Sequence, residues 1–219
     1  MMLNIRVIFT KKGRAKYIGH LDVSRLMQRA LKRAGLPVWY TEGFNPHMYV
    51  TFALPLPLGY ESESEIMDLR LTEPIPFGEV KDRLNAVLPE GIYVLSVAEP
   101  VHKAAQIVCA DYEIRLFPEN GSPEELLKQW NRFTAQESIP VVKRTKKGPK
   151  TVDIKPDIQQ LNATASGEEL KLTLRLPAGL SKTINPTLVL ENFFPFCGEA
   201  CFFTVNRTRL YCEHAEAFR

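Results

Sequence analysis

The chain has 219 residues, of which 45% are hydrophobic and 24% are charged, and this composition is typical of an ordinary soluble globular protein. It has no apolar run of about 18 residues and no secretory signal in its first residues, so we expect a cytoplasmic protein without a membrane span. The net charge is only +3, but residues 1–40 carry nine lysines and arginines against one aspartate, which indicates a localised anionic partner such as nucleic acid.

The first hundred residues show two kinds of apolar spacing. Alternating apolar residues predict strands, and spacing of three or four residues predicts helices. The predicted elements, in chain order, are a strand over 3–10, a helix over 20–34, strands over 49–54 and 66–71, a helix over 76–87 and a strand over 92–97. Alternating glutamates predict an acidic loop over 61–65. This order is that of the split β-α-β, or ferredoxin-like, fold, in which both helices cover one face of an antiparallel sheet.

The second half is predicted to repeat this order after a linker at 100–105. The predicted elements are a strand over 107–117, a helix over 123–135, an interrupted strand over 139–142 and 153–154, a strand over 169–176, a helix over 185–194 and a strand over 201–212. A basic loop over 143–155 holds six cations and one aspartate. The sequence therefore predicts an α+β fold of tandem ferredoxin-like domains, one over 1–100 and the other over 101–219.

The helix over 20–34 is amphipathic. Its apolar stripe consists of Val23, Leu26, Met27, Ala30, Leu31 and Ala34. The opposite side carries Asp22, Arg25, Arg29, Lys32 and Arg33 at helical spacing. Asp22 favours the positive end of the helix dipole, and Gly35 is expected to end the helix as its C′ residue. We therefore expect one buried stripe and an exposed row of cations.

The segment over 41–47 combines turn chemistry with three unlike side chains. Gly43 permits a positive φ, and Asn45-Pro46 favours an extended residue that enters a turn. Beside the cationic helix, Phe44, Asn45 and His47 suggest a ligand-binding loop. The structural alternative is that Phe44 fills the core, Asn45 caps the turn and His47 lies on the surface.

Four motifs resemble the radical SAM-linked domain family. They are Tyr17–Asp22, Gln28–Pro37, Gly43–His47 and Phe52–Ser62. This bacterial family has no assigned function, and its members are often fused to a radical SAM protein or encoded beside one. The resemblance is strongest over 3–70, and Met48-Tyr49 departs from it, since a second proline or a basic residue is expected there. It implies a radical SAM protein as a partner.

The chain lacks the usual motifs of metal and cofactor chemistry. Its four cysteines are Cys109, Cys197, Cys201 and Cys212. A radical SAM cluster needs a further cysteine three residues after Cys201, where Thr204 stands, so we interpret the cysteines as structural. No P-loop or dinucleotide-binding turn is present. We predict no cofactor and no metal site, although His20, Asp22 and His47 form a conceivable metal set.

Three functions remain open. The first is an RNA-binding or substrate-presenting partner of a radical SAM enzyme, in RNA modification or in ribosome or tRNA maturation. Its candidate RNA- or anion-binding residues are Lys16, Tyr17, Arg25, Arg29, Lys32, Arg33, Tyr40, Phe44, Asn45, His47, Lys143, Arg144, Lys146, Lys147 and Lys150. The second is an RNA-processing enzyme with His20, Asp22 or His47 as catalytic candidates. The third is a protein adaptor whose basic helix docks on the radical SAM partner without RNA. The lack of a catalytic motif favours the non-enzymatic functions.

Overall fold

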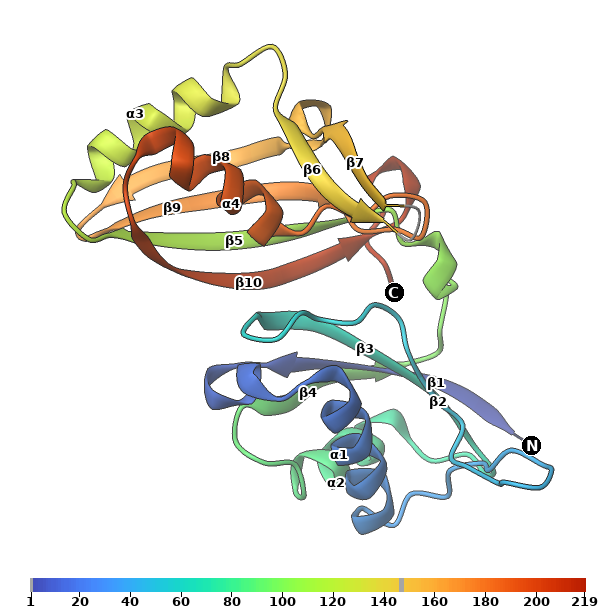
Figure 1. Cartoon of the computed structure of the whole chain (residues 1–219). Coiled ribbons are helices and arrows are strands. Elements are labelled where there is room, and N and C mark those ends of the chain that lie inside the picture. Colours follow the sequence, from blue (N-terminus) through green and yellow to red (C-terminus); the bar gives the residue numbers. More distant parts are fainter. Residues whose placement is uncertain (1, 146–147) are drawn as a thin grey trace. The chain divides into compact units, whose positions relative to one another are not determined.

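A computed structural model describes residues 2–145 and 148–219 of the chain (Figure 1). The chain divides into two compact units, one made of residues 1–106 with 218–219 and the other of residues 107–217. Each unit is built from antiparallel strands and two α-helices, so the predicted α+β class is confirmed. No helix among the described residues is both long enough and apolar enough to span a bilayer.

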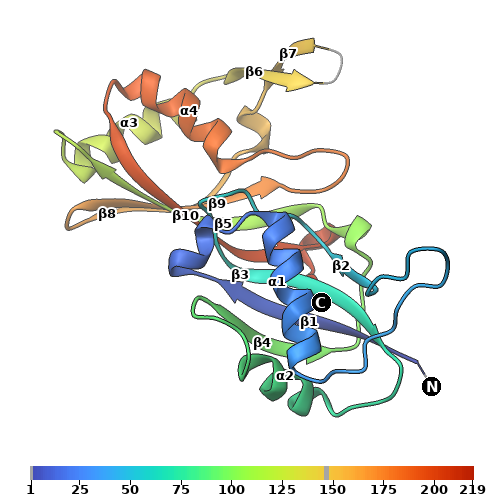
Figure 2. The same ribbon diagram turned by 60° about the horizontal axis from the view of Figure 1, so that its bottom comes forward.

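The first unit contains four strands and two helices in the described residues. They are β1 (Leu3–Lys11), α1 (His20–Arg33), β2 (Val50–Phe52), β3 (Glu61–Leu71), α2 (Phe77–Asn85) and β4 (Ile92–Ala98). The sheet order is β4-β1-β3, and β2 pairs with β3. Both helices lie on the same side of this sheet (Figure 2). The other side of the sheet is therefore not covered by α1 or α2.

The core of this unit lies between the sheet and the helices. Alternate residues of β1, namely Ile5, Val7 and Phe9, are fully buried because one face of the strand turns toward α1. On α1 the buried residues are Val23, Met27, Ala30 and Leu31, and Leu26 and Ala34 lie half-buried at the edge of this stripe. Burial of each large side chain contributes about 2 kcal/mol. The predicted apolar stripe is thus confirmed, and it fixes which face of α1 meets solvent.

Two of the cations near the N-terminus do not reach solvent. Arg6 is 1% exposed, and its guanidinium donates to both carboxylate oxygens of Asp68, each at 2.7 Å, and to the His102 carbonyl at 2.8 Å. The same guanidinium lies 4.3 Å from the centroid of the Phe218 ring. Lys11 is also buried, and its Nζ donates to the Lys16 carbonyl. The surface charge of this unit is therefore smaller than the sequence count suggests.

The second unit has a four-stranded sheet and a separate hairpin. Its elements are β5 (Cys109–Pro118), α3 (Pro123–Thr134), β6 (Pro140–Thr145), β7 (Gly148–Asp153), β8 (Gln159–Ser166), β9 (Glu169–Pro177), α4 (Pro186–Cys197) and β10 (Cys201–Tyr211). The sheet order is β10-β5-β9-β8, and β6 and β7 form a separate two-stranded sheet. Trp130, Phe133 and Phe193 pack against one another between α3 and α4, with ring centroids 5.1 to 5.7 Å apart.

Two predictions of local structure were wrong, and one strand was not predicted. Residues 61–65 are not a loop but the first half of β3, where Ser62 pairs with Lys11 and the serine side chains are buried. Within the predicted basic loop, residues 143–145 belong to β6 and residues 148–153 to β7, and Lys143 pairs with Lys150 across the two strands. β8 was not predicted, because most of its side chains are polar or exposed.

The start of α3 gives a test of local helix capping. The Ser122 Oγ accepts a hydrogen bond from the Glu125 backbone N at 3.2 Å. Replacement of Ser122 by alanine leaves this N–H without its cap and is expected to lower the free energy of unfolding by about 1 kcal/mol. Urea unfolding measures this change, and Ser138→Ala, at an exposed serine beyond the helix, is the control. Equal unfolding midpoints for the two variants would contradict the role of the cap.

Candidate functional site

The helix α1 positions the candidate cations. Its first turn begins after Gly19, whose carbonyl accepts from the Asp22 N at 3.0 Å and the Val23 N at 2.9 Å. It ends before Gly35, whose φ of +63° is the left-handed conformation expected of a C′ glycine. Because Val23 and the other buried residues face the sheet, the cations project from the solvent side of the helix.

The cations of α1 differ in how much of their hydrogen-bonding capacity is used. Arg25 Nη1 lies 3.1 Å from Asp22 Oδ1, but both side chains are largely exposed, so water and salt weaken this pair. Arg33 Nη2 donates to the Val87 carbonyl at 2.8 Å. Arg29 has no hydrogen bond or ion pair within residues 2–145 and 148–219. Lys32 likewise has none among these residues, so Arg29 and Lys32 are the cations of α1 most available to an anionic ligand.

The segment that follows α1 folds into a closed turn. Tyr40 and Met48 form a β-bridge at its base, and the Thr41 N donates to the His47 carbonyl at 2.8 Å. The His47 ring is held from inside the turn, because its Nδ1 lies 3.0 Å from Thr41 Oγ1 and 3.2 Å from the Asn45 carbonyl oxygen. Its Nε2 has no partner in the described part of the chain. The turn therefore fixes the orientation of the imidazole and leaves one ring nitrogen for a ligand.

The helix and the turn enclose one hollow of about 350 Å³. The residues that line it are Arg25, Gln28, Arg29, Lys32, Tyr40, Pro46, His47 and Met48. Lys32 Nζ lies 6.0 Å from the centroid of the Tyr40 ring, which joins the two sides of the hollow. The structure thus brings three predicted cations together with a predicted aromatic residue and a predicted imidazole, although they come from two separate motifs.

Other candidates lie outside this hollow. Phe44 is fully exposed at the tip of the turn, so the alternative in which it fills the core is wrong. Asn45 takes part in the turn through its carbonyl, which lies 3.2 Å from His47 Nδ1, and it does not line the hollow. Tyr17 is 68% exposed before α1, and Lys16 lies 3.9 Å from Glu61.

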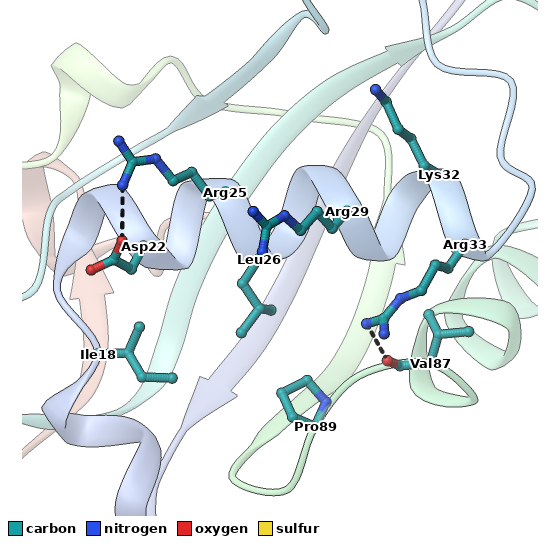
Figure 3. A pocket seen from close by; sticks show the side chains of 9 residues that line it. All are labelled: Ile18, Asp22, Arg25, Leu26, Arg29, Lys32, Arg33, Val87 and Pro89. Atoms are coloured by element: carbon teal, nitrogen blue, oxygen red, sulfur yellow. Dashed lines mark hydrogen bonds and ion pairs between the residues drawn. The ribbon is translucent and has the colours of Figure 1, made fainter.

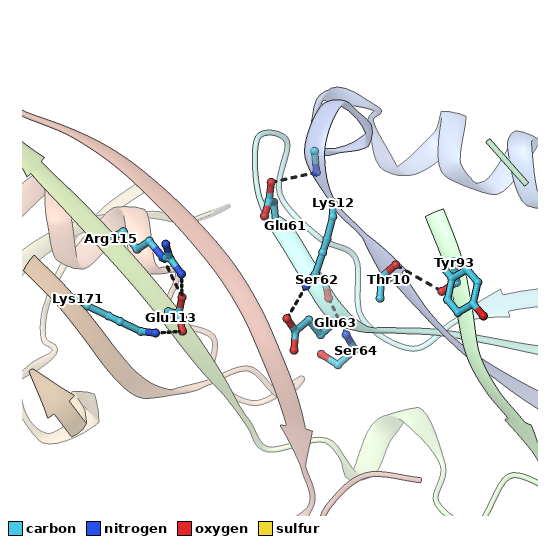
Figure 4. Close-up of polar contacts among 11 residues, drawn as sticks. Thr10, Lys12, Glu61, Ser62, Glu63, Ser64, Tyr93, Glu113, Arg115 and Lys171 are labelled. Carbon is cyan, nitrogen blue, oxygen red and sulfur yellow. Dashed lines mark hydrogen bonds and ion pairs between the residues drawn. The ribbon is translucent and has the colours of Figure 1, made fainter. Parts of the chain in front are cut away.

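The first half of β3 supplies acidic partners for the basic segment before α1. Lys12 Nζ lies 2.6 Å from Glu63 Oε1, and the Gly13 N donates to Glu61 Oε1 at 3.1 Å (Figure 4). A second group in the same figure, from the other unit, joins Glu113 to Arg115 and Lys171. The carboxylates at 61 and 63 therefore offset the charge of Lys12 and Lys16, whereas Arg29 and Lys32 of α1 have no carboxylate partner among the described residues.

The histidines and cysteines do not form a joint site. His20 is half-buried and packs edge-on against Phe52, with ring centroids 5.4 Å apart, and it is not among the residues that line the hollow with His47. Among the described residues, no three His, Cys, Asp or Glu side chains lie where they could hold a metal ion. Burial raises the pKa of the Cys201 thiol to about 12, so this thiol stays protonated at neutral pH.

The basic residues of the second unit are positioned by the β6–β7 hairpin. Lys143 Nζ donates to the Thr183 carbonyl at 2.7 Å, and Lys150 is exposed. Lys146 and Lys147 lie outside the described residues, as does the side chain of Arg144.

A second hollow, of about 850 Å³, lies beside α1 and was not predicted (Figure 3). Its lining consists of Ile18, Asp22, Arg25, Leu26, Arg29, Lys32, Arg33, Val87 and Pro89. Figure 3 shows Leu26 and Arg33 on the side of α1 that faces Val87 and Pro89, whereas Arg25 and Lys32 extend the other way. The sequence places Leu26 in the apolar stripe but does not mark this hollow, because Val87 and Pro89 are brought there by tertiary packing.

Comparison with known proteins identifies a family. A family model described as an uncharacterized protein conserved in bacteria, DUF2344, matches residues 4–186. The chain belongs to the DUF2344 family. No curated protein matches the sequence. The radical SAM partner implied by the sequence motifs therefore stays a prediction for this DUF2344 chain.

Two solved structures are similar to the DUF2344 chain. One is the crystal structure of a Cbf5-Nop10-Gar1 complex, with 10% identity and a TM-score of 0.51 over 94% of this chain and 48% of that chain. The DUF2344 chain thus spans about half the length of that one, and the likeness concerns the fold alone. The other is an unknown protein from Galdieria sulphuraria, with 14% identity and a TM-score of 0.27 over 94% of this chain and 99% of that chain.

Proposed function

We propose that the hollow between α1 and the turn over 40–48 binds RNA. The observation that carries this proposal is that Arg25, Arg29 and Lys32 line the same hollow as Tyr40 and His47. Cations neutralise phosphates, whereas aromatic and polar side chains contact bases and sugars, and RNA offers both kinds of group in each nucleotide. A site for a simple anion would need the cations but not the other two side chains.

Each side chain has a distinct role in this proposal. Arg29, which is unpaired, contacts a phosphate. Arg25 contacts another phosphate when it gives up its weak ion pair with Asp22. Tyr40 offers a ring face for a base. The carbonyl of Asn45 can only accept a hydrogen bond, so its contact with His47 Nδ1 favours a proton on that nitrogen. With the proton on Nδ1, Nε2 is the ring nitrogen that can accept from a base N–H or a ribose 2′-OH.

The wider role rests on the sequence motifs. We propose that the chain is an RNA-binding or substrate-presenting partner of a radical SAM enzyme, in RNA modification or in ribosome or tRNA maturation. The resemblance of residues 3–70 to the radical SAM-linked family supports the partner. The acid–base alternative uses His20 or His47, of which His47 lines the hollow and His20 does not, and no observation favours catalysis over binding. Asp22, the remaining catalytic candidate, is paired with Arg25.

We also propose that each unit is a ferredoxin-like domain. In the first unit β2 lies next to β3 in the order β4-β1-β3, and the second unit has the order β10-β5-β9-β8. When the β6–β7 hairpin is set aside, both orders place the fourth strand first, followed by the first, third and second. The helices follow the first and third strands in both units, which is the split β-α-β connection.

Tyr40 provides the test that separates RNA binding from simple attraction between charges. We expect Tyr40→Ala to weaken the binding of a labelled single-stranded RNA of about 12 nucleotides by 1–3 kcal/mol, about 5- to 150-fold, because one base loses its stacking partner. Fluorescence anisotropy at constant salt measures the affinity. Tyr93→Ala is the matched control, since Tyr93 is an exposed tyrosine on β4 and lines neither hollow. Equal affinities of the two variants would contradict the role of Tyr40.

A further inference from the structure

The larger hollow beside α1 differs in chemistry from the proposed RNA site. Ile18, Leu26, Val87 and Pro89 give it an aliphatic floor, and no aromatic side chain is among its lining residues. Bases that are held outside a helix are commonly stacked on aromatic rings or guanidinium planes, and the guanidiniums of this hollow lie along its edge and not on its floor. An aliphatic floor instead matches the aliphatic side chains of another protein, because both surfaces lose contact with water when they meet.

The charges around this floor are mostly positive. Arg29 and Arg33 lie along its edge on α1, and the carboxylate Asp22, at the opposite end, is already paired with Arg25. Arg33 uses one N–H on the Val87 carbonyl, and a guanidinium has five N–H donors, so four remain for a ligand. A partner that complements this surface therefore carries aliphatic anchors with acidic side chains beside them.

The lining of this hollow on α1 is long enough for an elongated ligand. Its lining on α1 runs from Asp22 to Arg33, which at 1.5 Å per residue is about 16 Å. About three turns of a partner helix have the same length. An amphipathic helix presents an apolar stripe with charged residues on either side, which is the arrangement that the floor and its edge would contact.

We propose that this hollow docks an acidic amphipathic helix of a partner protein, with leucine-type side chains on the aliphatic floor and carboxylates on Arg29 and Arg33. The proposal is separate from the RNA site, because Ile18, Val87 and Pro89 line only this hollow, and Tyr40 and His47 line only the other. Arg25, Arg29 and Lys32 line both. A helix bound here therefore competes with RNA for the shared guanidiniums.

A designed peptide tests the proposal on the whole chain. The probe is a labelled peptide of about 14 residues with leucines at helical spacing and glutamates beside them, and its control has the same composition with the leucines out of phase. We expect fluorescence anisotropy to show binding of the first peptide only. Pro89→Glu should weaken this binding at least 10-fold, because it puts a carboxylate on the floor at an exposed residue. Pro74→Glu, at an exposed proline outside this hollow, should leave it unchanged.

The same variants separate this site from the RNA site. Tyr40→Ala should leave peptide binding unchanged, and Pro89→Glu should leave RNA binding unchanged. The docking proposal fails if the in-phase peptide does not bind, or if Pro89→Glu and Pro74→Glu bind it equally. The docking proposal also fails if Pro89→Glu weakens RNA binding and leaves peptide binding unchanged, since the hollow would then be part of the RNA site. None of these results changes the loss of RNA affinity expected for Tyr40→Ala, so the two proposals are tested independently.

Discussion

Replacement of Arg25, Arg29 and Lys32 together by alanine is expected to lower the affinity for single-stranded RNA about 100-fold near 0.1 M salt. Each phosphate contact releases a counterion and contributes about 0.7 to the slope of log affinity against log salt. Three lost contacts should therefore reduce this slope by about 2 units. The three side chains line the same hollow, so their loss removes its cations without exposing any core residue.

A charge-matched variant controls for the net charge of the chain. Lys81, Lys103 and Arg132 line neither hollow, and their replacement by alanine removes the same three charges. Anisotropy titrations between 50 and 300 mM salt, chosen to span about a twofold range of Debye length, give both slopes. A similar loss of slope in both triple variants would mean that RNA responds to overall charge and not to the hollow.

Loss of the Asp68 carboxylate should cause the largest loss of stability. Asp68→Asn leaves the guanidinium of Arg6 buried without its counter-charge, and breaking such a pair costs about 3–5 kcal/mol. Urea unfolding of the first unit, followed through the near-ultraviolet signal, should show a midpoint well below that of the unchanged chain. Asp82→Asn, at an exposed aspartate of α2, should unfold as the unchanged chain does.

A double replacement distinguishes the cost of an uncompensated buried charge from the cost of lost packing. With Arg6→Met and Asp68→Leu together, no uncompensated charge remains, so most of the stability lost in Asp68→Asn should return. The account of Arg6 fails if Asp68→Asn unfolds like Asp82→Asn, because the carboxylate would then contribute little. This pair also explains why Arg6 cannot serve as an RNA contact despite its place in the basic N-terminal segment.

The long periodic elements of the chain could be predicted from sequence because one face of each is buried. The helix predicted over 20–34 is observed over His20–Arg33, and the strand predicted over 3–10 is observed over Leu3–Lys11. The first half of β3 could not be predicted, because its glutamates and serines lack an apolar alternation. These residues form a strand since β1 pairs with them, and that pairing is a tertiary effect.

The candidate site was predictable only where local motifs carry it. The cations of α1 and the turn with His47 are separate sequence signals, and the structure places them around one hollow. Their role in RNA binding stays a prediction. The second hollow needs Val87 and Pro89 from beyond α2, and nothing in their local sequence marks them as neighbours of α1. Side chains that meet only through packing are the ones that sequence patterns miss.

Photochemical crosslinking to RNA tests the central claim most directly. A single-stranded RNA that contains 4-thiouridine would be irradiated with the whole chain, and the crosslinked peptides would be mapped by mass spectrometry. We predict crosslinks at Tyr40 or His47, which are lost in the Arg25, Arg29 and Lys32 variant and kept in its charge-matched control. Crosslinks confined to residues outside this hollow, or equally strong in both variants, would contradict the assignment of an RNA site beside α1.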